Sequence, residues 1–171
     1  MGRSKKGFVP DSVYVNVMEH IPILCVDLLI INDAGEYLLV KRKDEPMKGR
    51  WWIVGGRILK GESLTKAAKR KAKEEIGAEI SLIVPLGFYE EHYKHNIYDL
   101  QSGIHTVSVV FLAVTKQKDF TLDKSSSKWQ FSKKLPSKLA NVQPFNLNLI
   151  NKSRELLTDD HFYKKETGYK Q

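Results

Sequence analysis

The sequence predicts one α/β domain of the α+β type, in which helices pack in layers on the faces of a mixed β-sheet. Two observations lead to this fold class. Apolar, β-rich runs lie before and after an amphipathic helix, and a second helical pattern follows the last of them. The chain has 171 residues, 42% of them hydrophobic, which suits one core of ordinary size. We expect disorder over residues 1–10, a single domain over 11–158 and a polar tail over 159–171.

The first segment of the domain, residues 11–20, fits two kinds of secondary structure. Asp11 can cap a helix, which predicts a helix that begins at this point. Val13, Val15 and Val17 lie at alternate positions, which is the pattern of a strand. The sequence leaves both possibilities open.

Six strands are expected, at residues 21–31, 37–41, 51–54, 80–91, 105–115 and 129–131. The first run, IPILCVDLLII, is so apolar that it should be a buried strand, and a turn at 32–35 makes the first two strands a hairpin. Trp51 and Trp52 could stack on a base, but neighbours on a strand face opposite ways, so at least one should lie in the core. Pro85 and Gly87 interrupt the fourth strand. A polar loop at 116–128 precedes the last one.

The best-defined helix lies in GRILKGESLTKAAKRKAKEEIGA, residues 56–78, after a short loop bounded by glycines. The Ser63 hydroxyl can accept a hydrogen bond from a backbone N–H at the start of this helix. Gly77 should end the helix with a positive φ. One apolar stripe recurs every four residues, at Leu64, Ala68, Ala72 and Ile76. The small alanines predict that the helix lies close against the sheet.

A last helix is expected to begin near Pro144, because proline suits a first helical turn. Leu147, Ile150 and Leu157 follow it at helical spacing. The polar residues after Asp159 should fray.

The net charge of +8 favours phosphate-bearing molecules or a simple solvated basic surface. The basic residues are spread over the chain, and neither an RNA-recognition aromatic motif nor a zinc-ligand spacing accompanies them. We therefore expect a solvated basic surface and no nucleic-acid partner.

Compartment and membrane association follow from the cysteine content and the apolar runs. Cys25 is the one cysteine, so no internal disulfide can form, which fits a reducing cytoplasm. It lies in an apolar run and should be a buried, inert thiol. No run is long enough to span a membrane, and the first residues lack the apolar core of a secretory signal. We expect a cytoplasmic protein without a membrane partner.

Two adjacent carboxylates, Glu74 and Glu75, lie near the C-terminal end of the helix, where the helix dipole disfavours acids. This placement indicates a bound cation, and Mg²⁺ or Mn²⁺ prefers oxygen ligands of this kind. The alternative is a solvated helix whose charges pair at i,i+4, as Arg70 with Glu74 and Lys71 with Glu75.

The stretch resembles the Nudix box, G-x5-E-x7-R-E-U-x-E-E-x-G-U, where U is a bulky aliphatic residue. Six fixed positions fall in register: Gly56, Glu62, Arg70, Glu74, Glu75 and Gly77. The box departs at Lys71, where glutamate is expected, and at Ala72 and Ala78, which are small for their places. The resemblance implies the α/β/α sandwich of the Nudix family with a mixed central sheet.

Residues 12–131 further resemble the GDP-mannose mannosyl hydrolase branch of this family. Members of that branch carry an aspartate in the first strand, an arginine at the end of the next strand and another after the double glycine. Asp27, Arg42 and Arg57 match these positions. The branch also lacks the glutamate after the box arginine, as here at Lys71, and its members tend to be homodimers.

The resemblance implies that Glu75 and the carbonyl of Gly55 are first ligands of the metal, with Glu74 nearby. The metal stabilises the departing diphosphate as a Lewis acid and a template. Arg70 would orient the carboxylates of the box rather than touch the substrate.

The resemblance also assigns substrate contacts. Arg42 and Arg57 would clamp the diphosphate, since the guanidinium fork matches phosphate oxygens. Asp27 would hold the sugar hydroxyls. Alternatively, Arg42 is a solvated strand-end residue, and Asp27 caps a buried backbone group.

The general base is not identified by the resemblance. The mannosyl hydrolase branch has a Gln-His pair in the loop before the last strand, whereas residues 123–128 contain neither residue. Four other residues could accept a proton from water: Asp123, Glu90, Glu91 and His92.

Three functions therefore remain open. The first is a Mg²⁺-dependent hydrolase of a nucleotide sugar such as GDP-mannose or GDP-glucose, in which water attacks the anomeric carbon. The second is a Nudix pyrophosphatase that cleaves the P–O–P bond of a nucleoside diphosphate derivative, with Glu90 or Glu91 as base. The third is a non-catalytic domain that binds a nucleotide or a partner. The third is favoured by Lys71, which would compete with a metal if it pairs with Glu75.

Overall fold

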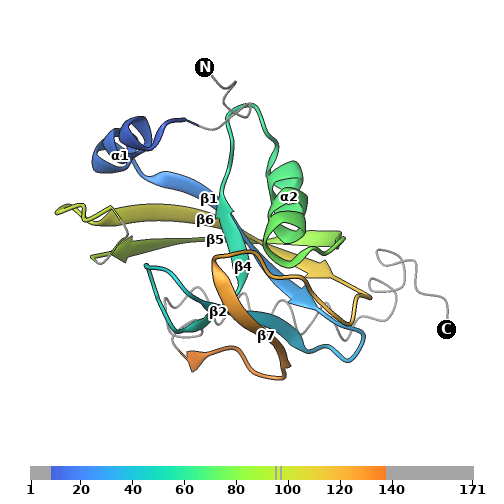
Figure 1. Ribbon diagram of the computed structural model, residues 1–171. Coiled ribbons are helices and arrows are strands. Elements are labelled where there is room, and N and C mark those ends of the chain that lie inside the picture. The colour runs from blue at the N-terminus through green and yellow to red at the C-terminus, as the bar shows by residue number, and fades with distance from the viewer. Residues whose placement is uncertain (1–8, 95, 97, 138–171) are drawn as a thin grey trace, which may run out of the picture.

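The computed structural model describes residues 9–94, 96 and 98–137 (Figure 1). The expected disorder of residues 1–8, the helix expected from Pro144 and the polar tail at 159–171 lie outside the described residues.

Two helices and seven strands form the described part of the chain. In chain order they are α1 Asp11–His20, β1 Ile23–Ile31, β2 Tyr37–Arg42, β3 Trp51–Trp52, β4 Val54–Arg57, α2 Leu64–Ile76, β5 Ser81–Tyr93, β6 Ile104–Val114 and β7 Ser126–Ser132. The strands form one mixed sheet in the order β3-β2-β1-β6-β5, with β4 paired to β1 and β7 paired to β2. The expected α+β arrangement with a mixed sheet is confirmed.

Residues 11–20 form a helix, α1. Its N-cap is Pro10, whose carbonyl accepts hydrogen bonds from the backbone N–H groups of Val13 and Tyr14. Met18 is buried, and Tyr14 packs partly against the same cluster. Val13 is 46% exposed, so the alternating valines do not mark a strand. Among all the residues that the structure describes, no helix has the length and apolar character that crossing a membrane requires.

The expected hairpin between β1 and β2 is closed only near its turn, where Ile31 pairs with Tyr37. Beyond that point the strands part. β1 continues beside β6 in parallel and beside β4 in antiparallel orientation. β2 instead pairs with β3 and β7.

The predicted strand 51–54 is in fact two strands. Trp51–Trp52 pairs with β2, whereas Val54–Arg57 pairs with β1, and the chain crosses between these partners at Ile53. Trp52 is buried, as expected for at least one of the two tryptophans.

The remaining strands differ from expectation at their ends. β5 is continuous over Ser81–Tyr93, and its register against β6 shifts twice, once between Pro85 and Gly87. β7 begins at Ser126, three residues earlier than predicted, because Ser126 pairs with Arg42 at the end of β2.

The core lies on both faces of the sheet. On one face α2 packs over β1 and β4, and its Ala68, Ala72 and Ile76 contact Val26 and Leu28 of β1 in one cluster. The opposite face carries a second apolar cluster, which includes Leu29, Ile31, Tyr89, Val110 and Leu112. Alternate residues of β1 thus serve the two faces, as the pleat requires.

Candidate functional site

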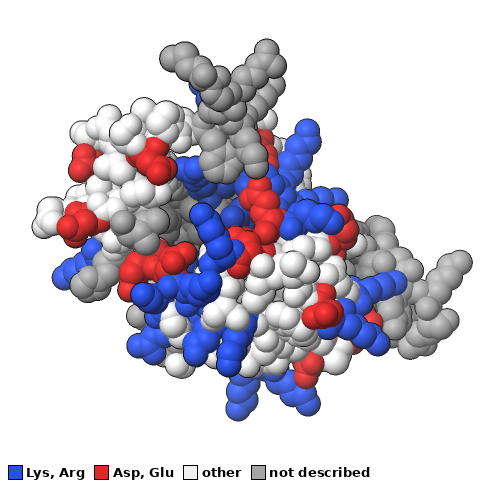
Figure 2. All heavy atoms as spheres, in the orientation of Figure 1, with Lys and Arg blue, Asp and Glu red and all other residues white. Residues whose placement is uncertain are grey.

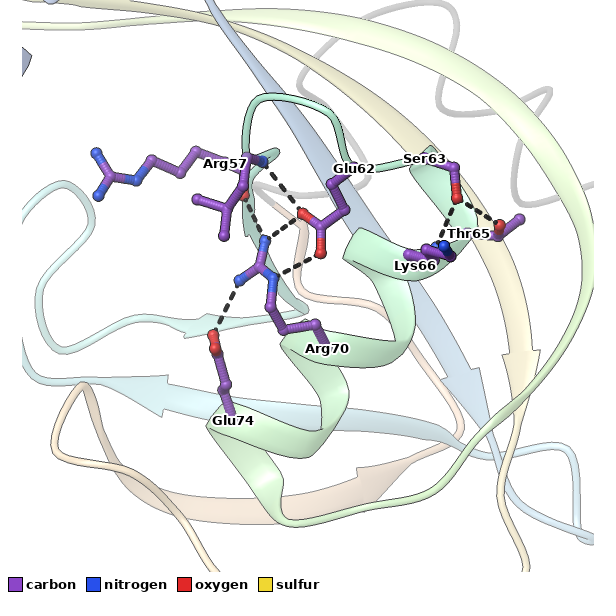
Figure 3. A network of polar contacts seen from close by, with 8 residues as sticks. Arg57, Glu62, Ser63, Thr65, Lys66, Arg70 and Glu74 are labelled. Atoms are coloured by element: carbon purple, nitrogen blue, oxygen red, sulfur yellow. Dashed lines mark hydrogen bonds and ion pairs between the residues drawn. The ribbon is translucent and has the colours of Figure 1, made fainter. Parts of the chain in front are cut away.

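A network centred on Arg70 fixes the loop before α2 to the helix (Figure 3). The Arg70 guanidinium donates two hydrogen bonds of 2.8 Å to the Glu62 carboxylate and one of 2.9 Å to Glu74. It also donates to the backbone carbonyl of Arg57 at 3.1 Å. The same Glu62 carboxylate accepts from the Leu59 backbone N–H, and its pKa is lowered, chiefly by the bonds from Arg70.

The ends of α2 are those predicted. The Ser63 hydroxyl accepts a hydrogen bond from the Lys66 backbone N–H at 3.3 Å, and Gly77 has a φ of 65°. The apolar stripe begins later than predicted, because Leu64 in the first turn is 36% exposed. The contact with the sheet starts with Ala67 and Ala68, which are fully buried.

One pocket brings together five of the predicted site residues. It has a volume of about 390 Å³, and its lining includes Asp27 of β1, Arg42 of β2, Gly55 and Arg57 of β4, and Glu75 of α2. The other two predicted residues, Arg70 and Glu74, form the network beside the pocket and do not line it.

Asp27 is buried where β1 meets β4. Its carboxylate accepts hydrogen bonds from the hydroxyls of Tyr89 and Ser108. A Cβ atom on Gly55 would lie 1.9 Å from Asp27 Oδ1 and 2.5 Å from the Val26 carbonyl oxygen, so this position must be glycine. Burial raises the pKa of Asp27, and the hydrogen bonds partly oppose this rise.

Glu75 lies in the pocket wall and contacts Lys71, one helical turn earlier. Lys71 Nζ lies 2.5 Å from Glu75 Oε1, and the two side chains are 17% and 12% exposed. The Gly55 backbone also hydrogen-bonds the Glu75 carboxylate. Burial raises the pKa of Glu75, and the charge of Lys71 opposes this rise. The pair expected as a possible i,i+4 contact is therefore formed inside the candidate site.

The two predicted phosphate-binding arginines are held differently. Arg42 Nε donates a 2.7 Å hydrogen bond to the Pro46 carbonyl, and its charge acts on Asp27. The Arg57 guanidinium lies over the ring of Tyr14 at 4.0 Å from its centroid, a cation–π contact. Tyr14 in turn meets Tyr98 edge to face at 5.9 Å.

These two tyrosines give the pocket an aromatic end that sequence reasoning missed. Tyr14 and Met18 are four residues apart, which is a helical spacing, but the alternating valines of the same segment obscured it. Tyr98 lies in a polar loop, where no local pattern marks it.

The four candidate bases are separated by the fold. Glu91 lines the pocket, and its carboxylate accepts a hydrogen bond from the Tyr93 hydroxyl. Glu90 is exposed and absent from the lining. His92 stacks on His105 at 4.1 Å and faces a neighbouring hollow of about 300 Å³. Asp123 accepts hydrogen bonds from Ser125, and its backbone N–H donates to the Glu75 carbonyl at 3.0 Å.

Cys25 also lines the pocket, and it is 8% exposed. Burial raises the pKa of its thiol to about 12. The predicted buried thiol is confirmed. It stays protonated at neutral pH, which makes it a poor nucleophile.

Within the described ranges, no three His, Cys, Asp or Glu side chains are grouped so that they could hold a metal ion. The negative charge of Asp123 contributes to the raised pKa of Glu75.

Comparison with known proteins agrees with the architecture. A family model described as the NUDIX domain matches residues 22–155, most of the chain. The low-salt glycan biosynthesis protein Agl8 of Haloferax volcanii is 29% identical over 119 residues, which are 70% of this chain and 76% of that protein. The ADP-ribose pyrophosphatase of Methanocaldococcus jannaschii is 34% identical over 91 residues, 53% of this chain and 50% of that protein.

A solved structure shares the fold. The MutT protein of Methanosarcina mazei superposes with a TM-score of 0.60 over 80% of this chain and 96% of that chain. The two sequences are 22% identical, so the likeness concerns the fold alone.

Proposed function

Because the chain belongs to the Nudix domain family, we propose that it is a hydrolase of a nucleotide sugar of the GDP-mannose or GDP-glucose type. The observation that carries the proposal is the convergence of Asp27, Arg42, Arg57 and Glu75 on one pocket of about 390 Å³. Two guanidinium groups suit a diphosphate, and a buried carboxylate suits sugar hydroxyls. The similarity to a glycan biosynthesis protein supports a substrate that contains a sugar.

In the proposed reaction, water attacks the anomeric carbon of the sugar. The bond from that carbon to the diphosphate oxygen breaks, and GDP leaves with the bonding electrons. Arg42 and Arg57 hold the diphosphate and stabilise its developing charge. Glu91 takes the proton of the water, because it is the candidate base that lines the same pocket. Asp27 orients the sugar.

Two oxygen donors of the pocket lining suit a hard divalent cation, Mg²⁺ or Mn²⁺. The Gly55 carbonyl and the half-buried Glu75 carboxylate are oxygen donors of the type that such ions prefer. When bound, the ion would supply Lewis-acid stabilisation of the departing diphosphate. Glu74 would join these ligands only after it leaves Arg70, which keeps Glu62 and Glu74 in place.

A second candidate is a pyrophosphatase that directs water to phosphorus and cleaves the P–O–P bond. It is supported by the position of Glu91 and by the similarity to an ADP-ribose pyrophosphatase.

In either case we propose that the protein is cytoplasmic, because its single cysteine fits a reducing compartment. We also propose that it is a homodimer, because it resembles the mannosyl hydrolase branch. Size-exclusion chromatography with light scattering tests the dimer.

Hydrolysis of GDP-mannose, GDP-glucose and ADP-ribose with Mg²⁺ in ¹⁸O-water separates the candidates, with products identified by mass spectrometry. Label in the released sugar supports attack at carbon. Label in a nucleoside monophosphate or a sugar phosphate supports the pyrophosphatase. No turnover of any compound would favour a non-catalytic binding domain, which the contact between Lys71 and Glu75 also supports.

Glu75→Gln tests the role of the pocket carboxylate in this assay. We expect turnover to be lost, because the variant removes the charged oxygen that faces the pocket. Glu79→Gln is the matched control, since Glu79 is 86% exposed and pairs with Lys73 outside the pocket. Full activity of Glu75→Gln would contradict the metal assignment.

A further inference from the structure

Lys71 brings a positive charge into the candidate site from within the chain. Its Nζ lies 2.5 Å from Glu75 Oε1, and its side chain is only 17% exposed. Lys71 also lines the pocket together with Arg42 and Arg57. Its charge acts on Asp27 across the pocket as well as on Glu75.

The backbone of β4 leaves room for this side chain. A Cβ atom on Gly56 would lie 2.9 Å from Lys71 Cε and 3.2 Å from Nζ. Gly56 also has a φ of 150°, which residues with a side chain rarely adopt. Lys71 therefore reaches Glu75 through a gap that exists because residue 56 is glycine.

Lys71 is half-buried, and a partly desolvated ammonium group is stabilised by hydrogen-bond acceptors close to it. An ammonium has three N–H donors, and the Glu75 oxygen takes one of them. The Lys71 side chain lines the same pocket as the Arg42 and Arg57 side chains. Phosphate oxygens are acceptors that suit such a group, and lysine binds them as a point charge.

We propose that Lys71 is the resident cation of this pocket and binds the diphosphate of the substrate directly, so that ligand binding needs no divalent metal. The inference rests on the proposed function, which requires a diphosphate in the pocket. A metal is then needed for turnover alone, and it must displace the Lys71 ammonium from Glu75 in order to bind there.

Calorimetric titration of GDP into the protein tests this proposal, first in EDTA and then with Mg²⁺. We expect the wild-type Kd in EDTA to lie within about threefold of the value with Mg²⁺. Lys71→Met should weaken binding in EDTA by about tenfold or more, which is typical for the loss of a hydrogen bond to a charged group. Lys69→Met is the matched control, because Lys69 is an exposed lysine of the same helix, and its Kd should not change.

Two further measurements guard against a folding defect. Lys71→Arg keeps a cation beside Glu75 and should retain most of the GDP binding in EDTA. Mn²⁺ binding, followed by the electron paramagnetic resonance signal of the ion in solution, should be tighter in Lys71→Met than in the wild type. Removal of the ammonium gives the ion access to the Glu75 carboxylate.

The outcomes distinguish the two proposals. Wild-type binding of GDP only when Mg²⁺ is present would overturn the role of Lys71 and leave the proposed hydrolase intact. The same holds if Lys71→Met binds GDP in EDTA as the wild type does. No binding of GDP under either condition would overturn both.

Discussion

Gly55 shows how tightly single residues are constrained where β4 pairs with β1. It pairs with Asp27, and its α-carbon faces the Asp27 carboxylate so closely that no side chain fits between them. The same residue hydrogen-bonds Glu75 through its backbone. One glycine thus sets the positions of two carboxylates that approach the pocket from different elements.

Gly55→Ala should lower the free energy of unfolding by about 3 kcal/mol, since the new Cβ would overlap Asp27 Oδ1 and the Val26 carbonyl. Urea denaturation followed by circular dichroism measures the loss. Gly61→Ala is the control: its φ is also positive, at 80°, but nothing lies within 4 Å of the added atom. Its cost should be near 1 kcal/mol. Equal costs for the two variants would contradict the steric argument.

The position of a single site residue could be predicted where a sequence motif fixes the register of its strand. Asp27, Arg42 and Arg57, which were chosen from their positions in the motif, line one pocket, and their roles stay predictions. The choice between Glu90 and Glu91 could not be made, because β5 shifts register twice against β6 before it reaches them. Each shift changes which face later residues point to.

At the level of elements, the loop before α2 and the helix behave as one unit because Arg70 joins them. Its guanidinium binds Glu62 in the loop, Glu74 on the helix and the carbonyl of Arg57 at the end of β4. The loop therefore keeps its position relative to both the helix and the sheet. The hydrogen bond from Arg70 to the Arg57 carbonyl holds the end of β4, and the Arg57 side chain lines the pocket from that strand.

Arg70→Met should lower the free energy of unfolding by about 1.5 kcal/mol at pH 7. The reason is that the variant removes the partly solvated, charge-assisted hydrogen bonds between Arg70 and Glu62. The contact lowers the pKa of folded Glu62 below its ordinary 4.5, so its stabilisation is complete above that pH. It is lost as the pH falls through the folded pKa. The difference between wild type and variant should therefore shrink below about pH 4.5 in urea denaturation at several pH values. A difference that persists at low pH would refute the coupling.

Elements whose partners lie far along the chain were the hardest to predict. The run 51–54 has the composition of one strand, yet β3 and β4 pair with different strands, and no local pattern marks the crossing at Ile53. α2 was predicted almost to its ends, because its caps Ser63 and Gly77 act within a few residues.

At the level of the whole molecule, the sequence carries a net charge of +8. On the face shown in Figure 2, lysine and arginine side chains spread widely, and acidic side chains lie among those near its centre. A surface with a net positive charge attracts a small polyanion over a distance.

This charge should affect the association rate of a diphosphate ligand more than its dissociation. In stopped-flow measurements with GDP, we expect the association rate constant to fall several-fold when ionic strength rises from about 10 mM to about 300 mM. The dissociation rate constant should change less than about twofold, since the contacts in the half-buried pocket are poorly screened. A salt effect confined to dissociation would contradict long-range attraction.

The early parting of β1 and β2 has a mechanical consequence for ligand recognition. The two strands pair at Ile31 and Tyr37, and their far portions each contribute a residue, Asp27 or Arg42, to the lining of one pocket. β1 and β2 are thus paired next to the turn and separated at the pocket. A ligand that binds both Asp27 and Arg42 would link the two strands at their separated ends. Its binding should therefore restrict the motion of β1 and β2 relative to each other.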